Sequence, residues 1–142
     1  MTTDTTETVR TEHAQLRDHV EHIRLAAREL RDLSDVERAE VLARILHFLH
    51  ETLLPHALEE EHTVYAAVAE ILGSTEATAT MVFDHAAIRA RVIELFATPQ
   101  DDIDKLQELL YSLHALISVH FAKEEQLYLP LLERPAQPAF NS

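Results

Sequence analysis

The residues LARILHFLHETLLPHALEEEHTVYAAVAEIL, numbered 42–72, decide the fold of this 142-residue chain. Apolar side chains recur there at alternating steps of three and four, which places them along one side of an α-helix. Pro55 lies inside the pattern and is expected to kink the helix, because proline has no backbone N–H to donate. His56 and Glu60 occupy two consecutive positions of the inward stripe, which reads Leu46, Leu49, Leu53, His56, Glu60, Val64, Ala67, Ile71.

Three further segments have the same periodicity, so the sequence predicts helices at about 9–33, 36–72, 76–97 and 103–133. Leu33-Ser34-Asp35 supplies a break and a helix N-cap, Gly73 ends the second helix, and residues 98–102 form the third connection. Four amphipathic helices with short loops predict an all-α fold, an up-down-up-down four-helix bundle. We expect one domain over residues 1–134 and a disordered tail over 135–142, where two prolines lie.

The composition excludes several classes of protein. A single glycine and 46% apolar residues favour long helices over folds that need many turns. The formal charge of −13 disfavours nucleic acid and anionic membranes as partners. Without cysteine there is no disulfide, zinc–thiolate site, iron–sulfur cluster or thiol nucleophile. The first eight residues are polar and no apolar run approaches the ~20 residues of a membrane span, so we expect a cytoplasmic protein.

Polar residues interrupt the predicted inward stripes of the other helices as well. The stripe of the fourth helix is Leu106, Leu109, Leu113, Leu116, His120, Glu124, Leu127, Leu131. The third helix has Met81, His85, Ile88, Val92, Leu95, and the first has His13, Leu16, Val20, Ile23, Ala27, Leu30. Each helix therefore turns at least one histidine inward, and two helices add a carboxylate one turn later.

The predicted levels of these residues agree along the bundle. His13 and His56 lie 21 and 22 residues from the break near residue 34, so at ~1.5 Å per residue they share a level. Glu60 and His85 are likewise 13 and 12 residues from Gly73. His120 is farther from its loop than His85 is, so that pairing requires an offset loop or a tilted helix.

Imidazole and carboxylate ligands together favour iron or manganese. Two facing His-x-x-x-Glu pairs are expected to hold two metals, with the carboxylates bridging them. His19 lies on a second possible inward stripe, so either His13 or His19, or both, would supply the ligand from the first helix. Glu125 is the alternative to Glu124. The candidate metal ligands are His13, His19, His56, Glu60, His85, His120 and Glu124.

Each of these residues, taken alone, could have a structural role instead of binding metal. A lone histidine on an apolar stripe is usually a hydrogen-bonded core residue, and an i, i+4 His–Glu pair is usually a surface interaction. The combined set is different, because unpaired buried charges cost several kcal/mol against a total stability of ~5–15 kcal/mol. Glu59 and Glu61 are expected to point to solvent. Tyr65 and Tyr128 are interpreted as packed aromatics, with a hydrogen bond to the site or iron binding as the alternative.

The chain resembles the hemerythrin-like, or HHE cation-binding, domain family. The stretches that carry the resemblance are Glu12-His13, LLPHALEEEHTVY (53–65), Asp84-His85 and VHFAKEEQLYLPLL (119–132). The resemblance implies a four-helix bundle with two iron ions in an oxo- or hydroxo-bridged di-iron centre. His13, His56, Glu60, His85, His120 and Glu124 match the ligand pattern of bacterial members.

The resemblance has two departures from the oxygen-carrying members. Those proteins have a second histidine four residues after the one in the third helix, where Arg89 stands here. They also place an aspartate five residues after the histidine of the fourth helix, whereas Glu124 and Glu125 are available here. The missing histidine leaves one iron with fewer protein ligands, unless His19 or a tyrosine replaces it. Arg89 is interpreted as pairing with Glu60 or a surface acid, and the alternative is that it steers anions or peroxide to the open site.

These features predict a non-haem di-iron protein that binds or reacts with dioxygen, peroxide or nitric oxide, in sensing, detoxification or iron handling. One alternative is a di-iron enzyme with catalase- or peroxidase-like activity. Another is a non-catalytic helical interaction domain that binds zinc or no metal. The expected partner is a small diatomic or peroxide ligand, and the oligomeric state is open.

Overall fold

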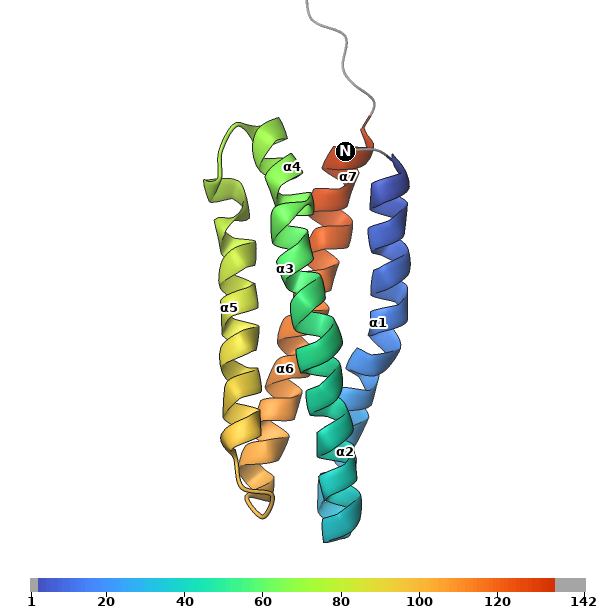
Figure 1. Ribbon diagram of the computed structural model, residues 1–142, viewed down its shortest axis with the longest axis vertical. Helices are drawn as coiled ribbons and strands as arrows, with labels where there is room; N and C mark the ends of the chain where they lie inside the picture. Colours follow the sequence, from blue (N-terminus) through green and yellow to red (C-terminus); the bar gives the residue numbers. More distant parts are fainter. Residues whose placement is uncertain (1–2, 135–142) are drawn as a thin grey trace, which may run out of the picture.

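The computed structural model describes residues 3–134, with side chains from residue 5 onward, and every regular element within this range is helical. Four antiparallel rods form an up-down-up-down bundle, which confirms the predicted fold class (Figure 1). The rods are α1 (Thr3–Glu29) with the 3-10 turn η1 (Leu30–Asp32); α2 (Asp35–Phe48), η2 (Leu49–Leu53), α3 (Leu54–His62) and α4 (Val64–Leu72); α5 (Glu76–Ala97); and α6 (Ile103–Lys123), η3 (Glu124–Tyr128) and α7 (Leu129–Glu133).

Local chemistry sets the ends of these rods. Ser34 Oγ accepts a hydrogen bond from Glu37 N, and Glu37 Oε1 accepts one from Ser34 N, both at 3.2 Å, so α2 begins with a capping box. Gly73 follows α4 with φ of 69°, a left-handed conformation that costs glycine little. Among residues 3–134, no helix has the length and apolar character that crossing a membrane would require.

The buried core consists of two apolar clusters with polar residues between them. The larger cluster lies toward the α1–α2 and α5–α6 loops and includes Ile23, Leu49 and Leu113. The smaller one includes Val9, Val64, Tyr65, Val68, Met81, Leu129 and Leu132. On each rod at least one candidate ligand falls between residues of the two clusters, as His13 does between Val9 and Leu16. The site is therefore a layer across the bundle, enclosed by hydrocarbon on both sides.

Two predicted stripe positions, Leu127 and Ile71, were wrong because the helical register changes. Leu127 is 61% exposed, and Leu129 and Leu132 are buried instead, because the π-helical turn η3 adds a residue to the repeat. Leu116 is partly buried and packs against the core, beside the buried Ile117.

Ile71 is wrong for a related reason. It is 55% exposed, and Val68 takes the core position. The register shifts at Thr63, where α3 ends and the Thr63 hydroxyl donates to Glu59 O at 2.8 Å. The regular helix is also interrupted near Pro55, because the π-helical turn η2 ends at Leu53 and α3 begins at Leu54.

Candidate metal centre

All four rods contribute to one polar layer. His13 comes from α1, His85 from α5 and His120 from α6. His56 and Glu60 come from α3, and Glu124 is the first residue of η3. Five of these six residues are at most 2% exposed, and the His56 side chain is 10% exposed. The Nε2 atoms of His85 and His120 are 2.8 Å apart, so the two residues share a level despite their unequal distances from the loop. Figure 1 shows that α6 is inclined relative to α5.

The ligand atoms form two groups that share one carboxylate. In the first group, donor atoms of His13, His56 and Glu60 all lie within 4.8 Å of one another. In the second, donor atoms of Glu60, His85 and His120 meet the same limit. A shared carboxylate between two three-residue groups is the arrangement expected for two metal ions bridged by Glu60.

The second carboxylate also lies between the groups. Glu124 Oε1 is 3.6 Å from His13 Nε2 and 3.3 Å from His120 Nε2. Glu60 Oε2 is 3.1 Å from His13 Nε2, and its Oε1 is 3.9 Å from His85 Nε2. Each carboxylate thus reaches histidines of both groups, so either one is placed to contact two ions.

Each of the four histidines directs its other ring nitrogen at an outer carboxylate. The pairs form a closed ring around the bundle, because each acid belongs to one rod and its histidine to the next. The Nδ1···O distances are 3.1 Å for His56 and Glu12, 3.3 Å for His85 and Glu61, 3.0 Å for His120 and Asp84, and 3.2 Å for His13 and Glu125.

This ring determines which ring nitrogens carry protons. An ionised carboxylate only accepts hydrogen bonds, so each Nδ1 must donate to its outer acid, and each Nε2 is turned toward the inner carboxylates and histidines, where it can bind a metal. The Nε2 atoms of His85 and His120 are 2.8 Å apart. Two nitrogen lone pairs at that distance repel unless a cation lies beside them.

Unpartnered atoms in the layer fit the same interpretation. Among the described residues, His56 Nε2, Glu60 Oε1 and Glu124 Oε1 are buried without a hydrogen-bond partner. His56 Nε2 does lie 3.3 Å from Glu60 Oε2, but it makes no hydrogen bond. Buried polar atoms are normally paired, and a bound cation would pair these three. Neutral imidazole nitrogens and carboxylate oxygens are suitable metal ligands.

When no cation is bound, burial favours the neutral forms of His85, His120 and Glu124. It lowers the pKa of His120 to about 4 and also lowers the pKa of His85, so both rings are neutral at pH 7. Burial and the contact with Glu60 raise the pKa of Glu124 to about 11. Burial alone would raise the pKa of Glu60, but its contacts with the His13 and His56 rings outweigh burial and lower that pKa. Metal-free protein therefore holds a proton on Glu124.

His19 does not join the layer, which corrects its place among the candidate ligands. Its side chain is exposed, and its ring stacks on Phe48 with centroids 4.6 Å apart. Six residues of helix rotate it by about 120° from His13, so the two cannot face one centre. Arg89 is exposed as well and makes no ion pair with Glu60 among the described residues.

The outer acids were the functional residues that the sequence interpretation missed. Glu61 was expected to be solvated, but its side chain is only 21% exposed and it pairs with His85. Glu125 was considered only as a substitute for Glu124, whereas it pairs with His13 and with Arg17. One signal was available, because every acid of the ring is next to a candidate ligand in sequence.

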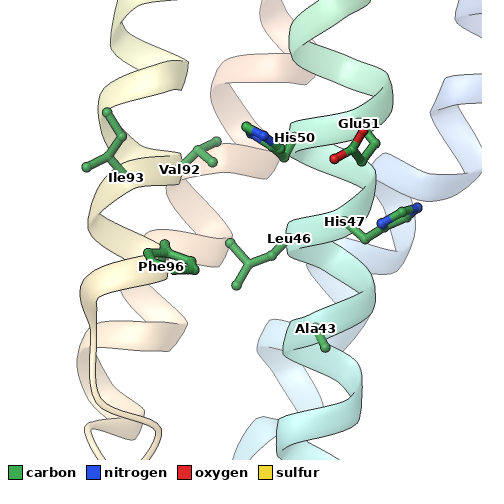
Figure 2. Close-up of a pocket in the computed structure, with 8 residues that line it drawn as sticks. All are labelled: Ala43, Leu46, His47, His50, Glu51, Val92, Ile93 and Phe96. Carbon is green, nitrogen blue, oxygen red and sulfur yellow. The ribbon is translucent and has the colours of Figure 1, made fainter.

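Two cavities differ in their relation to the layer. A cavity of about 10 Å³ touches the ligands and is otherwise apolar, with Leu53, Ile88 and Phe121 in its wall. A groove of about 550 Å³ lies between α2 and α5, away from the ligands (Figure 2). Its side chains His47 and His50 point in different directions, so they do not form a second metal site (Figure 2).

Comparison with known proteins agrees with the geometry. The family model described as Hemerythrin HHE cation binding domain matches residues 4–132, a range that contains every residue of the polar layer. This match confirms the resemblance inferred from the motifs. No curated protein and no solved structure matches the chain.

Proposed function

Because this chain belongs to the hemerythrin HHE cation-binding family, we propose that its polar layer holds two iron ions and binds or reacts with dioxygen, peroxide or nitric oxide. The observation that carries the proposal is the pair of three-residue groups joined by Glu60. The donors are imidazole nitrogens and carboxylate oxygens, a set that suits iron. Bound iron would supply redox chemistry that the side chains lack.

The side chains have separate roles in this proposal. His13 and His56 would hold one ion, and His85 and His120 the other, each through Nε2. Glu60 and Glu124 would bridge the ions as carboxylates, so metal binding would displace the proton that Glu124 holds in its absence. The acids of the outer ring orient the imidazoles through Nδ1 and raise their basicity.

The apolar cavity beside the layer is evidence that the ligand is small and uncharged. Its volume of about 10 Å³ is close to the room that one water-sized molecule needs. Leu53 and Ile88 offer such a molecule no hydrogen bond, so they favour a diatomic gas over a large polar substrate. They also limit the access of bulk water to the ligands.

Metal analysis tests the proposal. Metal-free protein would be loaded anaerobically with ferrous iron and freed of excess metal. We expect about two irons per chain, and an absorption spectrum that changes when air or nitric oxide is added. A chain that binds no iron would overturn the proposal.

The loaded protein also distinguishes a binding protein from a catalase- or peroxidase-like enzyme. Oxygen release from added peroxide over many turnovers would establish the enzyme. A spectral change without turnover would establish a carrier or sensor. A His120→Ala variant is the control, because it loses a proposed ligand and should lose either response.

A further inference from the structure

Tyr65 occupies a place in the polar layer that packing alone does not explain. It is the second residue of α4 and is 2% exposed. Its Oη lies 2.8 Å from His120 Nε2, 3.1 Å from His85 Nε2 and 3.0 Å from Glu124 Oε2. The phenol therefore contacts the two histidines of one metal group and a bridging carboxylate.

The single O–H group of Tyr65 cannot donate a hydrogen bond to all the acceptor atoms around it. His85 and His120 donate through Nδ1 to Glu61 and Asp84, so their Nε2 atoms can only accept. One O–H group can donate to one acceptor at a time. Tyr65 Oη thus presents its own lone pairs to at least one nitrogen lone pair at about 3 Å. A cation among these atoms removes that conflict.

The spacing of the three atoms is that of ligands on one ion. Oη and the two Nε2 atoms form a triangle with sides of 2.8, 2.8 and 3.1 Å. Adjacent ligands in an octahedral arrangement with bonds of ~2.0–2.1 Å lie ~3 Å apart. The triangle therefore matches one face of a coordination sphere.

We infer that Tyr65 is a metal ligand that binds, as a phenolate, the same ion as His85 and His120. This inference rests on the proposed function, because it requires a metal in the layer. On binding, the phenolic O–H bond breaks, a metal–oxygen bond forms and the proton leaves to solvent, with no change in oxidation state. Tyr65 then replaces the histidine that is absent from α5, where Arg89 faces solvent.

Tyr128 provides a matched contrast. It follows the second His-x-x-x-Glu pair much as Tyr65 follows the first, and the two ring centroids are 6.4 Å apart. Its hydroxyl donates to the carbonyl oxygen of Ala77 at 2.6 Å, so it has a backbone partner. Tyr128 is packed as the sequence interpretation expected, and it is the control for Tyr65.

The experiment uses the full chain loaded with iron and oxidised in air. A phenolate bound to ferric iron gives a broad visible absorption band and enhanced ring vibrations in resonance Raman spectra. We expect both signals in the wild type and in Tyr128→Phe. Tyr65→Phe should lose most of the visible absorbance while it retains about two irons per chain.

A second variant keeps the test independent of whether Tyr65→Phe folds. The chain has three tyrosines, so Tyr65 is the only one left in the double variant Tyr111→Phe/Tyr128→Phe. The Raman signal should persist there, and its loss would overturn the inference. Two bound ferric ions without the visible band would do the same and leave the proposed function standing. Failure to bind iron at all would overturn both.

Discussion

The two parts of the core meet opposite physical demands. The larger apolar cluster contains residues such as Ile23, Leu110 and Leu113, all at most 1% exposed, and packing alone satisfies them. The polar layer is as well buried but leaves three side-chain atoms without hydrogen bonds among the described residues. A buried leucine or isoleucine contributes ~1.5–3 kcal/mol, whereas an unpaired buried charge costs several. The apolar part therefore stabilises the fold with or without metal, and the layer contributes only when cations are bound.

The largest test of this contrast removes the shared ligand. Glu60→Ala should eliminate the binding of both metals, because Glu60 belongs to both groups. Each site saturated at 1,000 times its dissociation constant stabilises the fold by ~4 kcal/mol, so the variant should lose at least that advantage in iron-containing buffer. Iron analysis and urea unfolding with and without iron measure the effect.

The neighbouring acid provides the control. Glu59→Ala changes an exposed carboxylate on the same helix and should bind about two irons. Full iron content in Glu60→Ala would contradict the assignment of Glu60 as the shared ligand.

A cavity made in the apolar cluster should lower stability without changing iron binding. Leu113 is fully buried, so Leu113→Ala should destabilise the fold by ~2–5 kcal/mol. The loss should be equal in metal-free and iron-loaded protein, and iron content should not change. Thermal unfolding of both forms is the measurement. A loss of iron at temperatures where the variant remains folded would show that the two parts of the core are not separable.

The pH dependence of stability sharpens the comparison further. The pKa of Glu124 is raised to about 11 in the folded metal-free protein, whereas the unfolded carboxyl ionises near 4.5. Between these values the folded state binds one more proton, so its stability falls as pH rises. The metal-free protein should lose up to about 3 kcal/mol between pH 7 and pH 9, measured by urea unfolding in a chelator. Iron-loaded protein and metal-free Glu124→Gln should not lose stability in this way as pH rises. If metal-free Glu124→Gln still loses stability, the pH dependence does not come from Glu124.

The smallest expected effect concerns the outer ring of acids. Glu61→Ala removes the acceptor of His85 Nδ1 and leaves every proposed ligand in place. We expect a 10–100-fold loss of metal affinity, the usual effect of losing such a partner, measured by chelator competition. The adjacent Glu59→Ala should bind as the wild type does. Equal affinity in both variants would show that the ring does not position the histidines.

Sequence periodicity predicted the four rods well because each rod buries one continuous apolar stripe. The third helix was predicted with the bounds Glu76–Ala97 that the structure has, and all five of its stripe residues are buried. Errors occurred where the repeat is not uniform, at Leu127 within η3 and at Ile71 beyond Thr63. A π-helical turn depends on packing between rods, so the period within one rod does not reveal it.

The candidate site was predictable in its residue types and level, and less so in its contacts. His13 and His19 could not be separated, because a helix with histidines six residues apart offers two possible faces. Only packing against α6 and α2 determines which face is buried. The role of Tyr65 was open for the same reason, since its partners lie 20, 55 and 59 residues away in sequence.

The sequence alone determined that this chain forms four amphipathic helices and that histidines and glutamates lie at one level among their apolar residues. Helical periodicity and the number of residues between two positions follow from the order of residues along the chain, so they can be read from the sequence. Only the tertiary structure decided that Glu60 is shared, that four outer acids close a ring, and that Tyr65 reaches the layer. Those contacts join different rods, and their geometry depends on how the rods pack rather than on any single helix.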